Sequence, residues 1–478
     1  MPLKSEDPII VWFRNDLRVS DNPALAEASK RAKVVPIYIH DPQDGSSFPL
    51  GAASKWWLHN SLDALSHRLK KLGCPLLLRK GKTKDILLGL AKETGAKVVH
   101  WNTRYLHHEV DMDSDISGKL EALGIEVCSY PGFLLSEPWE IHNQSGFAFK
   151  VFTPFWKHCL EKLNPATPLP APIAVESMEN PPQSQAIEDL GLFPKIEWYG
   201  GMDEFWNPGE SGAQANLASF IADIFRAYSS SRDIPGTRGT SRLSPHLHFG
   251  EISPRQIWHA LKGTGIIGWK NSQFLAEVGW REFAYHLLHA FPETTCHPLR
   301  PEFQHFPWEP DDRLLHAWQK GMTGYPLVDA GMRELWATGW MHNRVRMVVA
   351  SFLIKHLLQD WREGAKWFWD TLVDADLASN TLGWQWTAGC GADAAPFFRI
   401  FNPTSQAQKF DPRGTYIHKW IPELRSLKPP ALFEPWKVPP LELGMAGIEL
   451  GKTYPVPVVN HPEARQKALD AYEATKGK

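Results

Sequence analysis

Cysteine is scarce in this chain, and none of it is placed for a metal site or a disulfide framework. The five cysteines, Cys74, Cys128, Cys159, Cys296 and Cys390, are scattered over 478 residues without a CxxC pair. An odd, widely spaced set suits a reducing compartment better than an oxidising one. We therefore expect a cytoplasmic protein without a cysteine-bound metal.

Long apolar runs and a leader-like start are also missing. No stretch approaches the roughly 20 apolar residues that a membrane-spanning helix needs. The first residues, MPLKSEDPIIVWF, contain no apolar h-region followed by a small-residue cleavage site. The sequence therefore predicts neither membrane insertion nor secretion.

An excess of charge of one sign is absent as well. The formal net charge is −2 at pH 7, so any binding to nucleic acid must rest on a local basic patch. No GxGxxG follows the first apolar run, which removes support for a dinucleotide site of the usual kind there. Tryptophan, by contrast, is abundant, with 22 residues. Most are expected to pack in cores, but indole also stacks on flat ligands and is oxidisable, so the placement of each one matters.

The N-terminal part alternates short β-branched runs with amphipathic stretches. Strands are expected at 9–13, 34–40, 76–80, 98–102 and 126–130, with helices between them, as at 54–72 and 83–94. Apolar strands separated by helices predict βαβ units and a doubly wound parallel sheet. We therefore expect an α/β domain over residues 1–135.

Prolines then break this rhythm. Six of them lie between Asn164 and Pro182, which predicts an interdomain linker, placed at 136–210. From about Ser211 the apolar period becomes helical, so an all-helical domain is expected over 211–478, ending in a helix near 461–475. One helix face is formed by Leu217, Phe220, Ile221, Ile224, Phe225 and Tyr228, and further helices are expected at 274–291, 326–337, 340–358 and 366–372.

Four segments of the helical part combine polar groups in ways that suit chemistry. In the loop 234–254, the hydroxyls of Thr240, Ser241 and Ser244 and the guanidinium of Arg242 could cradle a phosphate at a helix start, or could simply cap that helix. Glu277, Trp280 and Arg281 share one helix face, either as a site or as a surface ion pair beside a core indole. The other two segments carry Asn343, Arg346 and Met347, and Asp374, Asp376, Asn380, Trp384 and Trp386. No further acid or histidine completes a ligand set there, so no metal is predicted.

Taken in order, these segments resemble the photolyase/cryptochrome family. The resemblance runs from VWFRNDLRVSDNPAL at 11–25 to FNPTSQAQKFDPRGTYIHKWIPEL at 401–424, and covers at least residues 8–425. It includes GTSRLSPHLHFGEISP, WREF, TGYPLVD, TGWMHNR, DWREG and APFFRIFNP. The resemblance implies an N-terminal antenna domain, a long linker and a helical domain that holds FAD in a bent conformation.

The same resemblance implies a role for individual residues. Arg346 and Asp374 should form an ion pair beside the flavin ring, Asp376 should meet its polar edge, and Asn380 should face its N5 atom. The remaining FAD contacts it implies are Tyr228, Thr240, Ser241, Arg242, Leu243, Ser244, Glu277, Arg281 and Ala375.

The implied activity is blue-light-driven electron transfer from reduced, anionic FAD to cyclobutane pyrimidine dimers in DNA. Photolyases flip the damaged bases out of the helix, and Glu277, Asn343 and Asn380 are the expected catalytic residues. The lesion should contact Glu277, Trp280, Asn343, Met347 and Trp386, and an electron-transfer chain should run through Trp308, Trp361 and Trp384. Candidate phosphate contacts around the cavity are Arg232, Arg238, Lys409 and Arg413.

Three branches of the family compete. A (6-4) photolyase would carry a histidine pair where this chain has Asn343 and Met347, and plant cryptochromes usually place Asp where it has Asn380. AASKWWLHNSLDAL (52–65) and FWDTLVDADL (368–377) nevertheless resemble plant cryptochromes. A class III photolyase, from the sister group of those cryptochromes, accounts for both observations. The alternative is a light-sensing cryptochrome without repair activity.

The expected partner is damaged DNA, bound by a monomer, and the expected antenna is methenyltetrahydrofolate. This chain has Asp111 and Met112 where the best-known folate pattern of the family has Asn and Glu. The class III resemblance points instead to Trp56 or Trp57 as a stacking platform, with packing against the sheet as the alternative for at least one of them.

Overall fold

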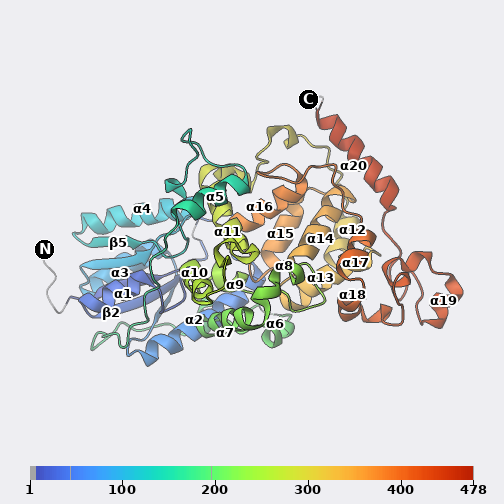
Figure 1. The fold of residues 1–478 in the computed structure, drawn as a ribbon. Coiled ribbons are helices and arrows are strands. Elements are labelled where there is room, and N and C mark those ends of the chain that lie inside the picture. Colours follow the sequence, from blue (N-terminus) through green and yellow to red (C-terminus); the bar gives the residue numbers. More distant parts are fainter. Residues whose placement is uncertain (1–6, 44, 195, 477–478) are drawn as a thin grey trace.

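The structure is a computed structural model that describes residues 7–43, 45–194 and 196–476. An α/β part lies at one end of the molecule and a helical part at the other (Figure 1). The sheet has the strand order β3-β2-β1-β4-β5, with all neighbours parallel. The doubly wound sheet expected from the sequence is confirmed, and its strand order reverses between β1 and β4, where such sheets bind ligands. The strands are β1 (Ile9–Phe13), β2 (Val34–His40), β3 (Leu77–Lys80), β4 (Val98–Asn102) and β5 (Glu126–Tyr130).

Helices cover both faces of this sheet. In strand β1, Ile9, Val11 and Phe13 pack with helices α1 (Pro23–Arg31) and α2 (Ala52–Lys71), whereas Ile10 and Trp12 pack with α3 (Thr83–Thr94) and α4 (His107–Ala122). Alternate residues of a strand point to opposite faces. A run that is apolar throughout is therefore buried on both sides, as in parallel sheets generally.

The region expected as a linker contains more structure than its prolines suggested. The stretch from Asn164 to Pro182, which is described throughout, forms no helix, but α5 (Phe152–Lys162) and α6 (Gly200–Phe205) lie on either side of it. Helix α5 buries Phe155, Trp156 and Cys159 in the same core as helix α11 (Gln273–Ala290). The buried residues of α5 span only five positions. The prolines that follow therefore favoured a linker over a helix when the sequence alone was considered.

The helical part is built from short and medium helices around separate hydrophobic clusters, one containing Phe352 and Trp384 and another containing Phe155 and Phe283. The single helix expected over 217–228 is wrong, because α7 ends at Ser219 and is followed by a π-helical turn, a 3₁₀ turn and the one-turn helix α8. The ring of Phe220 lies 4.2 Å from Phe274 and 5.5 Å from Tyr228, so tertiary packing overrides the sequence period here. The helices are α7 (Glu210–Ser219), α8 (Tyr228–Ser231), α9 (Ser244–His248), α10 (Pro254–Gly263), α11 (Gln273–Ala290), α12 (Asp312–Gln319), α13 (Pro326–Thr338), α14 (Asn343–Lys355), α15 (Trp361–Thr371), α16 (Leu377–Ala388), α17 (Pro403–Phe410), α18 (Thr415–Trp420), α19 (Pro440–Met445) and α20 (His461–Lys476).

The TGYPLVD motif (323–329) holds the C-terminal segment against the core through hydrogen bonds. Asp329 is fully buried and accepts hydrogen bonds from the Thr323 amide at 2.7 Å and from the Tyr454 hydroxyl at 2.7 Å. The hydroxyl of Tyr325 donates to the Val459 carbonyl at 2.8 Å. The motif thus has a structural role in this chain, and helix α20 begins two residues after Val459.

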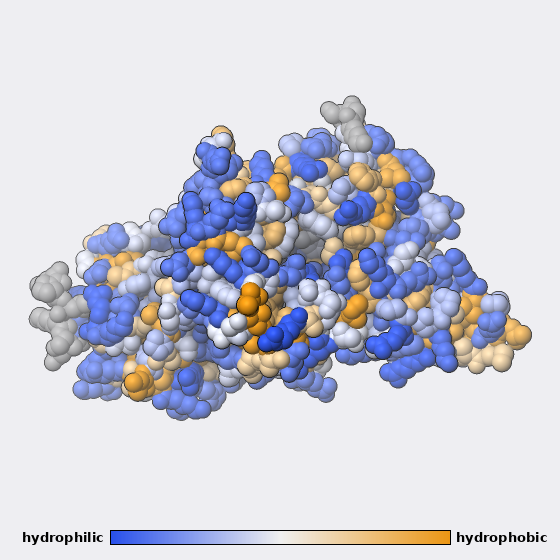
Figure 2. Space-filling model, viewed as in Figure 1, coloured by the Kyte–Doolittle hydropathy of each residue, from blue (hydrophilic) through white to orange (hydrophobic). Residues whose placement is uncertain are grey.

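Hydrophilic residues predominate on the face shown in Figure 2, with apolar residues gathered in small separate patches. One patch lies at the end of the molecule near α19, where Leu441 and Met445 are 77% and 83% exposed. None of the helices in the described ranges is long and apolar enough to cross a membrane. Within the same ranges, no three acidic, histidine or cysteine side chains are grouped so as to hold a metal ion.

Candidate functional site

The loop before α9 keeps its hydroxyls accessible but turns its arginine away. Thr240 and Ser241 are half-buried and Ser244 is exposed. Arg242 has φ +54°, a conformation that costs a non-glycine residue energy and persists where the surroundings enforce it. Its guanidinium lies 4.0 Å from the ring of Phe205 and 5.1 Å from Trp340. The guanidinium is thus held against α6, and the expected phosphate contacts of Arg242 and of the neighbouring hydroxyls stay predictions.

An ion pair connects α14 to the segment before α16, as expected. Nη2 of Arg346 lies 3.0 and 2.9 Å from the two carboxylate oxygens of Asp374, and Nε donates to the Met341 carbonyl at 2.8 Å. The Asp374 side chain is 4% exposed. Loss of either partner would strand a buried charge, which typically costs about 3–5 kcal/mol.

Asp376 has contacts other than those expected. Its Oδ1 caps α16 by accepting from the Ser379 amide at 2.8 Å, and its Oδ2 accepts from the Tyr285 hydroxyl and faces His248 Nδ1 at 3.7 Å. Burial alone would raise the pKa of Asp376, but hydrogen bonds and charge from His248, Arg281 and Tyr285 outweigh it and hold that pKa below its usual value. Both oxygens are engaged within the protein, and because a carboxylate has further acceptor positions, its expected contact with the flavin edge stays a prediction.

Asn380 lies on α16 and Tyr228 on α8. Asn380 stands in the first turn of α16 and donates from Nδ2 to the Ala365 carbonyl of α15 at 3.0 Å. Tyr228 is 8% exposed, and burial raises the pKa of its hydroxyl. Ala375 and Leu243, which were also expected at the cofactor, are buried.

The three side chains predicted to share one face of α11 diverge. Glu277 pairs with Arg232, whereas Arg281 donates to the Phe133 carbonyl at 2.9 Å and stacks on the Phe133 ring at 4.1 Å. The partnership between Glu277 and Arg281 considered from the sequence is not formed. The indole of Trp280 lies parallel to Phe152 of α5, with ring centroids 3.9 Å apart and 9° between the planes.

Ion pairs connect Glu277 to the start of α14. Arg232 contacts Asp233, and Asp233 in turn accepts from Arg344 Nη2 at 2.9 Å. Arg344 also lies 3.7 Å from the sulfur of Met347. The exposed Asn343 begins the same helix. Glu277 on α11 and Met347 on α14, both expected to contact the lesion, are thus linked through Arg232, Asp233 and Arg344. Arg232 was expected to contact a DNA phosphate, and the other two were not expected at the site.

The expected electron-transfer tryptophans belong to one core cluster. Trp384 is 2% exposed and packs so closely on α15 that a Cβ on Gly364 would lie 2.0 Å from its ring. Trp361 stands three residues before Gly364 on that helix, and Trp308 is partly buried beside Phe306, 4.3 Å away. Trp318, which the sequence argument did not single out, lies edge-on to Trp384 at 6.2 Å. Trp386 is half-buried on the same helix as Trp384.

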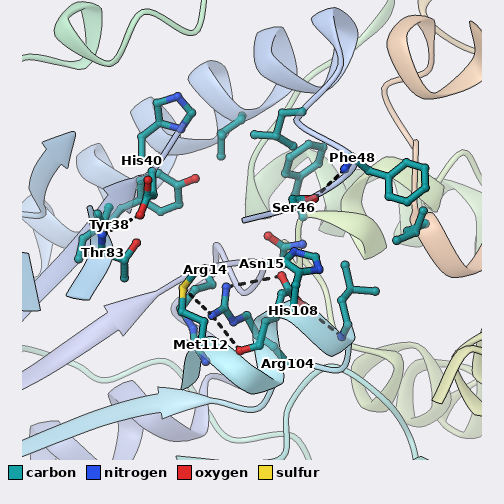
Figure 3. A pocket seen from close by; sticks show the side chains of 18 of the residues that line it. Arg14, Asn15, Tyr38, His40, Ser46, Phe48, Thr83, Arg104, His108 and Met112 are labelled. Carbon is teal, nitrogen blue, oxygen red and sulfur yellow. Dashed lines mark hydrogen bonds and ion pairs between the residues drawn. The ribbon is translucent and has the colours of Figure 1, made fainter. Parts of the chain in front are cut away.

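A second candidate site lies between the two parts of the molecule (Figure 3). This cavity of about 330 Å³ opens at the carboxyl ends of β1, β2 and β4 and extends to His248 and Asp376. Arg14 lies 4.2 Å from the Trp12 ring and pairs with Asp113, and burial lowers the pKa of its guanidinium to about 10. This site is not predicted from the sequence, although polar residues follow each of these strands. Figure 3 shows Arg14, Tyr38, His40, Ser46, Phe48, Thr83, Arg104, His108 and Met112 around it.

The tryptophan pair expected as an antenna platform does not line this cavity. Trp56 and Trp57 are 1% and 0% exposed, and the cavity contacts Lys55 and Leu58 of the same helix instead. Trp57 donates to Glu251 at 2.9 Å and meets the ring of Trp206 edge-on at 5.3 Å. Both indoles pack in the core, which corrects the expectation of a stacking platform at either position.

The burial of Trp57 gives a stability prediction. Trp57→Ala should lower the free energy of unfolding by about 3–5 kcal/mol, because a large cavity remains and Oε1 of the buried Glu251 loses its donor, while Oε2 keeps its contact with His246. Denaturant unfolding followed by circular dichroism measures the loss. Lys55→Ala, on the same helix but facing the cavity, should change it by no more than about 0.5 kcal/mol. A loss below about 1 kcal/mol for Trp57→Ala would contradict the packing role.

Comparison with known proteins agrees with these features. A family model described as the FAD binding domain of DNA photolyase matches residues 274–474, and one described as DNA photolyase matches residues 9–173. The chain is 48% identical to a deoxyribodipyrimidine photo-lyase of Agrobacterium fabrum, covering all of this chain and 99% of that one. It is 40% identical to Cryptochrome-1 of Arabidopsis thaliana, covering 97% of this chain and 70% of the relative.

Solved structures give the same grouping. A class III photolyase from Agrobacterium tumefaciens superposes with a TM-score of 0.96 at 48% identity and covers 100% of this chain and 99% of its own. A photolyase from Sulfolobus tokodaii, described with two FAD molecules, superposes with a TM-score of 0.82 at 31% identity and covers 98% of this chain and 100% of its own.

Proposed function

The chain belongs to the photolyase/cryptochrome family, and we propose that it is a deoxyribodipyrimidine photo-lyase that repairs cyclobutane pyrimidine dimers in DNA. The observation that carries the proposal is the 48% identity over the full length to a photo-lyase, against 40% to a plant cryptochrome. Asn343 and Met347 support it, because neither can take the role of the histidine pair that the resemblance associates with (6-4) lesions.

The helical domain is an FAD-binding domain, and its residues fit that cofactor. Among the described side chains, Nη2 of Arg281 is a buried donor without a hydrogen-bond partner, which suits a group that brings its own oxygens. The hydroxyls of Thr240, Ser241 and Ser244 would hold the phosphates, and the Arg346–Asp374 pair would lie against the ring system. When bound in its reduced form, FAD supplies the electron that blue light drives onto the dimer and accepts it back.

The protein's own part in such a reaction is binding, orientation and exclusion of water. No group is transferred, so no nucleophile is needed. Trp280 would stack on the flipped dimer with one face, while Phe152 supports the other face and fixes the plane of the indole. Glu277 would donate a hydrogen bond from its carboxyl to a dimer carbonyl, which stabilises the negative charge that develops there.

A repair assay on defined lesions tests the proposal. The FAD-loaded, reduced protein is illuminated with blue light in the presence of oligonucleotides that carry either one cyclobutane dimer or one (6-4) lesion, and the products are separated chromatographically. Only the cyclobutane dimer should revert, and only in the light. Absence of repair of either lesion would favour the cryptochrome alternative.

We also propose that the cavity between the two parts of the molecule binds an antenna chromophore, methenyltetrahydrofolate. Arg14 and Arg104 suit an anionic ligand, and Tyr38, Phe48 and Trp369 suit a flat one. His248 belongs to this cavity and to the helix of the cofactor loop, so a chromophore there would lie next to the FAD site.

Reconstitution tests the antenna. With folate added, the protein should gain near-ultraviolet absorbance beyond that of FAD, and Arg104→Ala should lose most of it because a charged contact is removed. Trp57→Phe, a conservative change outside the cavity, should retain the band. Equal bands in both variants would remove the cavity from this role, and reconstitution with FAD in place of folate would identify a second flavin as the occupant.

A further inference from the structure

Four charged side chains of alternating sign run between the expected lesion contacts. We call Glu277, Arg232, Asp233 and Arg344 the charge chain. Arg232 Nη1 donates to Glu277 Oε1, Arg232 Nε lies 3.9 Å from Asp233 Oδ1, and that oxygen lies 2.9 Å from Arg344 Nη2. The side chains of Arg232 and Glu277 are 16% and 29% exposed. The chain is thus partly buried and electrically neutral as a whole.

The charge chain conflicts with the proposed role of Glu277 as a hydrogen-bond donor to the dimer. A carboxylate that accepts from a guanidinium is ionised and offers no proton, whereas a donor to the dimer must be a neutral carboxyl. Gln273 Nε2 also donates to Glu277 Oε1, at 2.8 Å. Glu277 must therefore exchange its partners and gain a proton between the free protein and the complex.

We propose that Arg232 is a positioning residue that holds Glu277 ionised in the free protein and moves to a DNA phosphate when the lesion binds, so that Glu277 takes up a proton. This rests on the role of Glu277 under the proposed function. The proton comes from solvent, no other bond is made or broken, and one arginine contact replaces another.

Arg232 is suited to such an exchange. It is the C-cap residue of α8 and begins the half-buried segment that leads into the cofactor loop. A guanidinium binds carboxylate and phosphate with the same two-pronged geometry. A DNA phosphate therefore competes directly with Glu277 for it. Burial alone would lower the pKa of Arg232, but the charge of Glu277 outweighs this effect and raises it.

The remaining neighbours favour a neutral Glu277 once Arg232 has left. Tyr228 from α8 and Gln273 of α11 lie near the carboxyl, and Arg344 of α14 stays occupied by Asp233. Once Arg232 pairs with the phosphate, and while Arg344 stays with Asp233, neither guanidinium of the charge chain remains opposite Glu277. A flipped dimer also displaces water from the cavity. Loss of the neighbouring cation and desolvation both disfavour an ionised carboxyl.

Proton uptake on binding is the first test. The full-length, FAD-loaded protein is titrated calorimetrically with an oligonucleotide carrying one cyclobutane dimer, at a fixed pH in buffers of different ionisation enthalpy. Wild type should take up about one proton per complex, and the affinity should fall by up to about tenfold for each pH unit above neutrality. Glu277→Gln should take up none. Wild-type binding without proton uptake would overturn the proposal.

Affinity for undamaged DNA is the second test, because a structural ion pair would not change it in this way. Glu277→Gln should bind undamaged DNA several-fold more tightly, since Arg232 is already free, and the same change in an Arg232→Gln background should have no effect. Arg232→Gln should also reduce the slope of log K against log salt by about 0.7–0.9. Gln273→Ala, which removes the other partner of Glu277 but no charge, should leave the salt slope unchanged.

These outcomes separate the inference from the function on which it rests. If Glu277→Ala retains the wild-type repair yield per absorbed photon, the role of Glu277 itself is wrong. If that yield falls, but proton uptake and the coupling to Arg232 are both absent, only the exchange of partners is wrong. The amide of Glu277→Gln can still donate a hydrogen bond, so this variant should keep more of the yield than Glu277→Ala.

Discussion

Trp384→Phe is expected to reduce light-driven reduction of bound, oxidised FAD by at least about a hundredfold. Trp384 is buried, and Gly364 lets α15 approach its ring more closely than any side chain would permit. Trp361 lies one turn earlier on α15, and Trp308 lies at the partly exposed edge of the same cluster. An electron moving inward from the surface would pass through Trp384 last. Phenylalanine fills a similar volume but is much harder to oxidise, so the chain would be broken without a large cavity.

The measurement is the loss of oxidised-flavin absorbance under blue light with an external reductant. Trp318→Phe is the matched control, because Trp318 is equally buried and touches Trp384 edge-on at 6.2 Å but is not one of the three expected members. Photoreduction should survive in that variant, and repair by chemically reduced protein should survive in both. Normal photoreduction in Trp384→Phe, or its loss in Trp318→Phe, would show that the electron follows another route.

The sheet and most long helices could be predicted because their apolar periods are strong. The strand boundaries expected at β1, β2, β4 and β5 agree with the structure. Strands β1, β2 and β4 are buried almost throughout and are mostly apolar, as central parallel strands usually are, whereas β5 is a partly exposed edge strand. The segment 217–228 failed because its period fits a helix, while packing of Phe220 on Phe274 imposes a π-turn there. Periodicity carries no information about such distant contacts.

The residue types at the site could be predicted better than their partners. Glu277 and Arg281 have helical spacing for an ion pair, but Arg232 and the Phe133 carbonyl, from other parts of the chain, take those contacts. Trp56 and Trp57 suggested a stacking surface, yet indoles flanked by other apolar residues on α2 belong to the core. Spacing along one helix predicts which side chains are neighbours on that helix. Which residues from other elements they contact depends on the tertiary fold.

Trp280→Ala should weaken binding to the cyclobutane dimer by about 1–3 kcal/mol for each base that stacks on the indole, which corresponds to at least about a fivefold loss of affinity. The indole lies parallel to Phe152 at 3.9 Å, so its orientation is fixed before the lesion arrives and little ordering cost remains on binding. Binding of undamaged DNA, which rests on phosphate contacts, should change much less. Competition titrations with matched damaged and undamaged oligonucleotides give both numbers.

Phe152 provides the critical comparison for Trp280. Phe152→Ala leaves the indole in place but removes the ring behind it, so affinity for the dimer should fall by less than in Trp280→Ala, while affinity for undamaged DNA stays near wild type. Phe152→Leu keeps apolar volume without a flat face, so its affinity for the dimer should lie between those of wild type and Phe152→Ala. If Trp280→Ala weakens both DNAs equally, the indole does not recognise the lesion. If Phe152→Ala matches wild type for both DNAs, the stack behind Trp280 is packing without a role in preorganising the lesion site.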